Sequence, residues 1–377
     1  MKFNCQKEDL LYAVQAVVRA VSTKNTLPIL EGIMICAKAN KLSFRATDLE
    51  MAMECLVDAD VLEEGTVVIS GRYFYDLVKH LPFGNVYFEK TGEQLTIEYD
   101  QSHISVHCLD PDEFPALPQM EEDISGEIPI PIFRRIVRQS SIAAATDEVR
   151  PIFSGIYTQF GDNQITMVTT DTHRLALCKG GWKGKAAQTY ILPTHTMQEI
   201  ARLAINEEES VIVTLSKNQV FFAIGNIIVV TRVINGQYPD YKQVLPTENL
   251  FVSQCVVNRQ RLIEALERAA LLPRDAIRGK SNVVKLAWQK DLLTLSADVP
   301  DVGRIKEEIP ISFQGKEIVS NYNAKYLLDA LRVMDSENVV MRLTGDNTPG
   351  IIVPDAAYET LADAPYTYLV LPMRVRV

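Results

Sequence analysis

The chain has 377 residues, of which 47% are hydrophobic and 23% are charged, and its 48 acidic side chains outnumber 38 basic ones to give a net charge of −10. These figures exclude a disordered chain, and the apolar runs are too short for a transmembrane helix, which needs roughly 20 residues. The net charge excludes binding to nucleic acid by overall charge alone, although it leaves room for local basic faces. The amino terminus lacks the apolar core of a secretory signal, so we expect a cytoplasmic protein.

The six cysteines are scattered along the chain, with no CxxC pair and no spacing typical of a zinc site. This pattern predicts reduced, mostly buried thiols. The sequence also contains neither of the glycine-rich motifs that bind nucleotide phosphates. We therefore expect no metal and no cofactor.

The sequence repeats itself at an offset of 123 residues. Residues 28–33 (PILEGI) fall on residues 151–156 (PIFSGI) with four of six positions identical, and the same offset places Thr47-Asp48 on Thr170-Asp171. A fainter third copy surrounds residues 293–298 (LTLSAD). Repeats of this length have the usual size of a domain. The chain is therefore predicted to contain three domains, at residues 1–125, 126–249 and 250–377.

Each repeat predicts two helices and several strands. Apolar residues recur at helical spacing from Leu10 to Val21 in the first repeat and from Leu262 to Ala270 in the third. A second helix is predicted after a short apolar strand, which occupies residues 67–69 in the first repeat and residues 190–192 in the second. Strand-like runs occupy residues 42–46, 94–99, 164–168 and 220–230. The predicted fold class is α+β, with an antiparallel sheet and two helices in each domain.

The second helices carry basic residues two turns apart, which places each pair on one stripe. The pairs are Arg72 with Lys79, His195 with Arg202, and Lys325 with Arg332. Taken singly, such pairs are typical of solvated helix faces. Their recurrence in a net-acidic chain favours a shared surface that faces a polyanion and contacts phosphates without reading bases.

A catalytic site is difficult to build from this sequence. Asp171 and His173 would share a face of a strand, but the sequence specifies no serine or cysteine nucleophile beside them. Asp48, Asp171 and Asp298 recur in all three repeats, which favours a role at turns or strand ends. His103 and His107 have no second cluster of ligands that could complete a metal site.

Two apolar features are open to two interpretations. Ile104 and Val106 alternate with polar residues, and Leu271-Leu272 follow the first helix of the third repeat. The chain ends in an apolar run, residues 368–375. Either feature is typical of core packing, but each could also supply a binding surface.

Several segments together resemble a known family. They are residues 26–30 (TLPIL), 170–177 (TDTHRLAL), 236–241 (GQYPDY), 244–246 (VLP) and 371–374 (LPMR). In order and spacing they are similar to the bacterial DNA polymerase III β subunits, the sliding clamps, over essentially the whole chain.

The resemblance implies a non-catalytic processivity factor that forms a ring as a head-to-tail homodimer. Six domains would surround duplex DNA, with sheets outside and two helices per domain inside. The partners implied are the replicative polymerase α subunit, the clamp-loader δ subunit, and other polymerases and repair proteins, which bind through short linear motifs.

The resemblance also implies residue roles. The DNA-facing residues would be Lys24, Arg72, Arg150, His195 and Arg202. The dimer contact would join Ile104 and Val106 to Leu271 and Leu272 of the second chain. The pocket for partner peptides would be formed by Phe153, Thr170, Thr172, His173, Arg174, Leu175, Pro239, Val244, Ile277, Asn323, Tyr326, Pro349, Leu369, Val370, Leu371, Pro372, Met373, Arg374 and Val375. Thr172 stands where the family commonly has glycine, and Arg376-Val377 extend past the usual end.

Two alternatives remain at this level. One is a ring or scaffold that binds proteins without DNA. The other is a hydrolase that uses Asp171 and His173.

Overall fold

The computed structural model describes residues 1–22, 27–118, 124–147, 149–272, 283–299, 302–356 and 364–373. Contacts divide the chain into two compact units. The first comprises Met1–Pro131, Lys183–Lys185 and His195–Val233, and the second comprises Ile132–Trp182, Ala186–Thr194 and Ile234–Val377. The middle repeat therefore contributes to both units.

The helices and strands follow the same order in every repeat, with β5 as an addition to the first. The first repeat contains β1 (Lys2–Gln6), α1 (Lys7–Val17), β2 (Gly32–Lys38), β3 (Lys41–Thr47), β4 (Met51–Asp58), β5 (Asp60–Glu63), β6 (Gly65–Ser70), α2 (Gly71–His80), β7 (Asn85–Thr91), β8 (Gln94–Tyr99) and β9 (Ser102–His107). The second contains β10 (Ile124–Pro129), α3 (Ile130–Ser141), β11 (Gly155–Phe160), β12 (Gln164–Thr170), β13 (Arg174–Gly181), β14 (Gln188–Pro193), α4 (Thr194–Leu203), β15 (Ser210–Leu215), β16 (Gln219–Ile224) and β17 (Ile227–Arg232). The third contains β18 (Ser253–Asn258), α5 (Arg259–Ala270), β19 (Val283–Gln289), β20 (Leu292–Val299), β21 (Gly303–Gly315), β22 (Ile318–Asn323), α6 (Ala324–Val333), β23 (Asn338–Leu343), β24 (Gly350–Pro354) and β25 (Tyr366–Val370).

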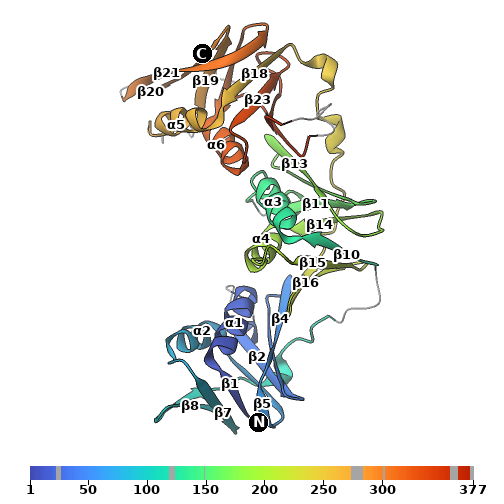
Figure 1. Ribbon diagram of the computed structural model, residues 1–377, viewed down its shortest axis with the longest axis vertical. Coiled ribbons are helices and arrows are strands. Elements are labelled where there is room, and N and C mark those ends of the chain that lie inside the picture. Colours follow the sequence, from blue (N-terminus) through green and yellow to red (C-terminus); the bar gives the residue numbers. More distant parts are fainter. Residues whose placement is uncertain are drawn as a thin grey trace. The chain divides into compact units, whose positions relative to one another are not determined.

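The described strands form three antiparallel sheets. The first compact unit holds a five-stranded sheet in the order β5-β1-β7-β8-β9 and an eight-stranded sheet in the order β10-β15-β16-β17-β4-β3-β2-β6. The second holds a 12-stranded sheet in the order β14-β11-β12-β13-β25-β24-β23-β18-β21-β20-β19-β22. Helices α1 and α2 contact each other and lie together on one face of the first repeat's strands, as α5 and α6 do in the third (Figure 1). The prediction of α+β repeats, each with two helices and antiparallel sheet, is confirmed.

Two sequence predictions of element bounds need correction. The helix expected to reach Val21 ends at Val17, where the backbone tightens into a 3₁₀ turn at Val18–Ala20. The run at residues 220–230 is not one strand, because Gly225 adopts a φ of +55° and turns the chain between β16 and β17. Apolar content alone could not locate this turn, since apolar residues continue on both sides of it.

Glycine is required at the same place in two repeats. The 3₁₀ turns Pro28–Glu31 and Pro151–Ser154 are followed by Gly32 and Gly155, which begin β2 and β11. A Cβ atom on Gly32 would lie 2.5 Å from Cγ1 of Val68, and one on Gly155 would lie 2.5 Å from Cγ2 of Ile191. Since Val68 and Ile191 also differ by the repeat offset, both repeats use glycine for the same close approach.

All six cysteines are unpaired thiols, and five of them are buried, as the sequence predicted. Burial raises the pKa of Cys5, Cys55 and Cys255 to about 12. None of the helices in the described ranges is long and apolar enough to cross a membrane.

Candidate functional site

The turn that joins β12 to β13 is fixed by two side chains. The Thr170 hydroxyl donates to the Arg174 carbonyl oxygen (2.7 Å) and accepts the Thr172 N–H (3.1 Å). Oδ1 of Asp171 accepts the backbone N–H groups of His173 (2.9 Å) and Arg174 (3.0 Å). The prediction that Asp171 and His173 share a face of a strand is therefore wrong, because both lie in a turn between β12 and β13. The Asp171 carboxylate stabilises this turn.

The first repeat builds the same turn between β3 and β4. The Thr47 hydroxyl donates to the Met51 carbonyl oxygen (2.8 Å) and accepts the Leu49 N–H (3.0 Å), while Asp48 accepts the N–H groups of residues 50 and 51. Asp298 of the third repeat instead lies near the end of β20 and pairs with Arg304 (2.7 Å). The recurring aspartates therefore hold two turns and one strand end, as their recurrence indicated.

The two turns share a strained central residue. Thr172 has a φ of +78° and Leu49 a φ of +76°. Side chains with a Cβ atom rarely adopt this left-handed region, and β-branched residues do so least. Thr172 thus occupies a conformation that suits glycine, at the position where the resemblance leads us to expect glycine.

Arg174 is the buried cation of the site. Its Nε donates to Oδ2 of Asp171 (2.9 Å) and its Nη1 to Oδ2 of Asp329 (2.7 Å). The guanidinium also lies 4.3 Å from the centroid of the Tyr326 ring. Lys325 donates to the same Asp329 oxygen (2.6 Å). This network joins the turn to the first six residues of α6.

The pKa values of this network follow from burial and charge. Burial disfavours the Arg174 guanidinium charge, but neighbouring Tyr368 and two carboxylates favour it more, so the pKa of Arg174 is raised. Burial raises the pKa of Tyr326, and the charges of Asp171 and Asp329 add to this effect. The charge on Arg174 is therefore permanent.

The end of the described chain lies along the same turn. The Leu371 N–H donates to the His173 carbonyl oxygen (2.9 Å), and the Met373 N–H donates to that of Asn321 (2.7 Å). The His173 ring stacks on Tyr326, with 6.5 Å between centroids and 20° between planes. Below them, Leu371 packs on a buried cluster composed of Val168, Leu175, Leu177, Tyr241, Val340, Ile351, Val353, Ala364 and Leu369. The structure thus brings together Thr170, Thr172, His173, Arg174, Leu175, Tyr326, Leu369, Val370, Leu371, Pro372 and Met373.

An aromatic group lies beside this cluster. The Phe153 ring is 6.0 Å from the ring of Tyr238, which precedes Pro239 and is 5.1 Å from the ring of Tyr157. Val244 is exposed in the same segment. The resulting wall is mostly apolar, with polar groups confined to the turn and to the start of α6.

The other predicted pocket residues have smaller roles or lie elsewhere. The Asn323 side chain accepts the Lys325 N–H (3.0 Å) and caps α6. Pro349 precedes β24, whose Gly350 pairs with Val370 of β25. Ile277, Arg374 and Val375 lie outside the described residues.

Sequence reasoning missed Asp329, although this residue holds both Arg174 and Lys325. Its spacing of four residues from Lys325 on a helix was the available signal. The sequence gives no comparable sign of its contact with Arg174, since the two residues are 155 positions apart.

The predicted basic stripes differ in how many of their charges are free. Arg72 and Lys79 are exposed on α2, and the described part of the chain provides no ion pair or side-chain hydrogen bond to either. In the third repeat, Lys325 pairs with Asp329 (2.6 Å) and Arg332 pairs with Glu267 (2.7 Å). The stripe of the third repeat is therefore neutralised, which the sequence pattern did not indicate.

The second repeat is intermediate. Arg202 and Arg19 both pair with the buried carboxylate of Glu199. His195 is exposed at the start of α4, and Arg150 is exposed beside Asp147 (3.5 Å). Lys24 lies outside the described residues.

The residues predicted for a dimer contact lie near two sheet edges. Ile104 is partly exposed and Val106 is buried on β9, the last strand of the five-stranded sheet. Leu271 is 80% exposed at the end of α5, a helix that contacts β20 and β21. Leu272 is partly buried beside it.

Two strand pairs join consecutive repeats, and they have the same register. At the first junction β17 pairs with β4, so that Thr231 lies opposite Met51; at the second, β25 pairs with β13, so that Val370 lies opposite Arg174. Met51 and Arg174 are separated by the repeat offset. The strand that leaves the turn described above is therefore the docking strand at both junctions.

The polar groups of the turn are engaged with one another. The described residues contain no group of three or more histidine, cysteine or acidic side chains placed to hold a metal ion. Asp171, the carboxylate of the hydrolase alternative, already accepts two backbone N–H groups and one guanidinium N–H.

Comparisons with known proteins agree over the whole chain. Residues 1–118, 127–240 and 242–374 match the family models of the N-terminal, central and C-terminal domains of the DNA polymerase III beta subunit. A beta sliding clamp from Bacillus subtilis is 31% identical over 99% of this chain and 100% of its own length. The crystal structure of a DNA polymerase sliding clamp from Bacillus subtilis is similar with a TM-score of 0.92, at 30% identity and full coverage of both chains. The DNA polymerase III subunit beta from Pseudomonas aeruginosa has a TM-score of 0.91 at 27% identity, covering 99% of this chain and 100% of its own.

Proposed function

Because the chain belongs to the DNA polymerase III β-subunit family, the β sliding clamps, it is a non-catalytic DNA sliding clamp, and we propose which of its surfaces close the ring, face DNA and hold partners. We infer the domain boundaries that the sequence predicts, near residues 125 and 249. The family matches, which change at residues 118–127 and 240–242, support this division. A role in replication supports a cytoplasmic location.

The proposal for ring closure rests on one observation: the strand pairs that join consecutive repeats have the same register at both junctions. Each junction pairs the last strand of one repeat with the fourth strand of the preceding repeat. Among the described residues, one last strand and one fourth strand each keep an unpaired edge. The last strand is β9 of the first repeat, and the fourth strand is β21 of the third repeat, whose first part pairs only with β20. Unpaired edges bind other strands readily. A second copy of the chain, placed head to tail, would satisfy both edges.

The register at this third junction follows from the other two. Ile104 occupies the place of Val229 in the hairpin β16–β17, since both are the third residue after a two-residue turn. Ile305 lies opposite Ala297 in the third repeat, just as Met53 lies opposite Ala46 in the first, so Ile305 corresponds to Met53. Because Val229 pairs with Met53, Ile104 of one chain would lie opposite Ile305 of the other.

Cross-linking tests this register. The chain carrying both Ile104→Cys and Ile305→Cys should become a covalent dimer with a short bis-maleimide, because facing Cβ atoms in a sheet are about 5 Å apart. The control pairs Ile104→Cys with Glu308→Cys, which lies about 10 Å further along the strand. Equal yields from the two pairs would show that the register is wrong.

The DNA-facing surface would comprise Arg72, Arg150, His195 and Arg202, together with Lys24. Arg72 and Lys79, the basic pair on α2, form no ion pair with any described residue and should contribute most. Such contacts reach phosphates only, which suits a ring that slides on any sequence. Topological retention also explains why a net charge of −10 is tolerated.

Salt dependence tests the DNA-facing surface. Each lost phosphate contact lowers the slope of log K against log [salt] by about 0.9, so the double variant Arg72→Glu/Lys79→Glu should lose up to about 1.8 from the slope of duplex binding. The control Lys217→Glu/Lys290→Glu makes the same change of charge at exposed hairpin turns. If the control weakens binding as much, the surface is assigned wrongly.

Partners would bind the apolar wall beside the turn at residues 171–173. An apolar surface with a few fixed polar groups is what capture of a short linear motif requires. We expect the polymerase α subunit, the clamp-loader δ subunit, and other polymerases and repair proteins to use this one pocket. Leu371→Asp should weaken binding of a fluorescent peptide from the polymerase α subunit at least tenfold, whereas Ile205→Asp, at an apolar side chain that is 71% exposed elsewhere, should not.

Loading onto a nicked circle tests the whole assignment. After incubation with a bacterial clamp loader and ATP, the protein should co-elute with the circular DNA and be released when the circle is cut. A scaffold that does not bind DNA would never co-elute. A protein that binds DNA without encircling it would remain bound after cutting.

A further inference from the structure

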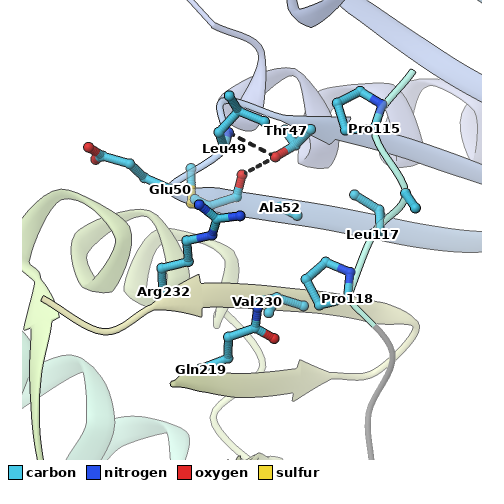
Figure 2. A pocket seen from close by; sticks show the side chains of 12 residues that line it. Thr47, Leu49, Glu50, Ala52, Pro115, Leu117, Pro118, Gln219, Val230 and Arg232 are labelled. Atoms are coloured by element: carbon cyan, nitrogen blue, oxygen red, sulfur yellow. Dashed lines mark hydrogen bonds between the residues drawn. The ribbon is translucent and has the colours of Figure 1, made fainter. Parts of the chain in front are cut away.

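A cavity of about 70 Å³ lies in the first compact unit, at the junction of β4 and β17. Its floor is formed by Ala52 and Val230, and the segment at residues 115–118 forms one wall (Figure 2); Met51 also lines it. Leu117 packs against the buried cluster of Ala52, Phe221 and Val230 at its base. The cavity is therefore formed by packed residues at the junction of the two strands.

This cavity repeats the proposed partner pocket position by position. At the repeat offset, Thr47, Leu49, Glu50, Met51 and Ala52 correspond to Thr170, Thr172, His173, Arg174 and Leu175. The matched registers of the two junctions make Val230 correspond to Leu369, and Arg232 to Leu371. Gln219 lies opposite Arg232 in the pair β16–β17, and Pro349 takes the equivalent place beside Leu371 in the pair β24–β25.

We infer that this cavity is a second, chemically distinct docking site, which takes an extended segment of a partner protein with an acidic residue next to a small aliphatic one. The inference rests on the proposed peptide pocket, whose architecture it shares. Three exchanges of charge separate the sites. The cation of the partner pocket, Arg174, is buried and paired, whereas here its place is taken by buried Met51. The cation here is Arg232 at the rim, in the place of Leu371, and Glu50 takes the place of His173.

Arg232 is available to a ligand. Its side chain is exposed, and no residue in the described ranges forms an ion pair or a side-chain hydrogen bond with it. In Figure 2 its guanidinium lies across the cavity from Leu117 and Pro118, while the Glu50 carboxylate points away. An unpaired guanidinium beside an apolar floor selects a carboxylate attached to an apolar group.

The size of the cavity limits the apolar anchor. A volume of about 70 Å³ is far below that of a pocket for a drug-sized ligand, which is roughly 300–1,000 Å³. A cavity of this size suits one small aliphatic side chain. Binding should therefore be weak and useful only together with a second contact, such as a motif in the partner pocket.

Methionine methyl groups provide a reporter in each site. Met51 lines this cavity, and Met373 lies in the partner pocket. With ¹³C-methyl labelling of the full chain, and Met51→Leu and Met373→Leu for assignment, the probe acetyl-Ser-Asp-Leu-Ser-amide should shift the Met51 signal in a saturable manner. The matched probe acetyl-Ser-Lys-Leu-Ser-amide should not.

Charge reversal completes the test. Arg232→Glu should weaken the acidic probe about tenfold and make the basic probe the better ligand. The inference is overturned if the Met51 signal does not move, moves equally with both probes, or is insensitive to Arg232→Glu. A peptide from the polymerase α subunit should shift Met373; if it does so while Met51 is silent, the second site fails and the proposed function stands. If Met373 also stays silent, the shared pocket architecture fails with it.

Discussion

The ion pair between Arg174 and Asp329 should be one of the strongest single contacts in the second compact unit. The Nη1 to Oδ2 distance is 2.7 Å, and the two side chains are only 8% and 19% exposed. A double-mutant cycle of Arg174→Met, Asp329→Asn and the combined variant isolates their coupling. Methionine is a suitable replacement because Met51 occupies the equivalent place in the first repeat and leaves its turn intact.

The size of the effect follows from what remains after the substitution. A hydrogen bond to a charged group contributes about 1.5–3 kcal/mol, and a cation–π contact about 0.5–2 kcal/mol. Asp171 keeps two backbone N–H donors, and Asp329 keeps Lys325. Neither carboxylate is stranded, so Arg174→Met should cost about 3 kcal/mol, near the lower end for a broken buried pair. The coupling with Asp329 should be about 2 kcal/mol.

Tryptophan fluorescence during urea unfolding measures this cost directly. The chain has two tryptophans, Trp182 and Trp288, and both are fully buried in the second compact unit. The control cycle uses Arg332 and Glu267, which are also 2.7 Å apart but have side chains that are 55% and 48% exposed; its coupling should stay below about 1 kcal/mol. Equal coupling in the two cycles would refute the argument that burial gives this contact its strength.

Three further predictions concern the same fold. Thr172→Gly should raise the free energy of unfolding by about 0.5–1 kcal/mol, since relief of the positive φ outweighs the entropy of glycine; a decrease in urea midpoint would contradict this. Gly155→Ala should cost about 1–3 kcal/mol through its clash in the sheet, whereas Gly161→Ala, whose Cβ would meet only an oxygen at 3.5 Å, should stay within about 0.5 kcal/mol. The free energy of unfolding should fall as pH rises above about 9. The thiols of Cys55 and Cys255, with pKa values of about 12, stay protonated in the folded chain, whereas the same thiols ionise in the unfolded chain. A free energy of unfolding that stays constant in urea titrations from pH 8 to 10 would refute this.

Local and periodic features were predictable from the sequence. The offset of 123 residues located equivalent helices, equivalent strands and the turn aspartates, because each depends on residues that are near one another in the chain. The end of α1 at Val17 and the turn at Gly225 were missed, since apolar spacing continues through both. The predicted pocket came from resemblance, and the structure brings most of its described members together around Arg174 and Leu371.

What the sequence by itself determined was the number of repeats, their α+β class and the family to which the chain belongs. Only the tertiary structure decided which charges are free. Arg332 pairs with Glu267, 65 positions away, and Arg174 with Asp329, 155 positions away, so neither pairing appears in any local pattern. The structure also decided that the strand after the turn serves both junctions in one register, and thus that the cavity at the first junction lies at the place of the proposed partner pocket at the second. Strand pairing between repeats depends on edges that meet only in the folded chain, which is why the sequence could not show it.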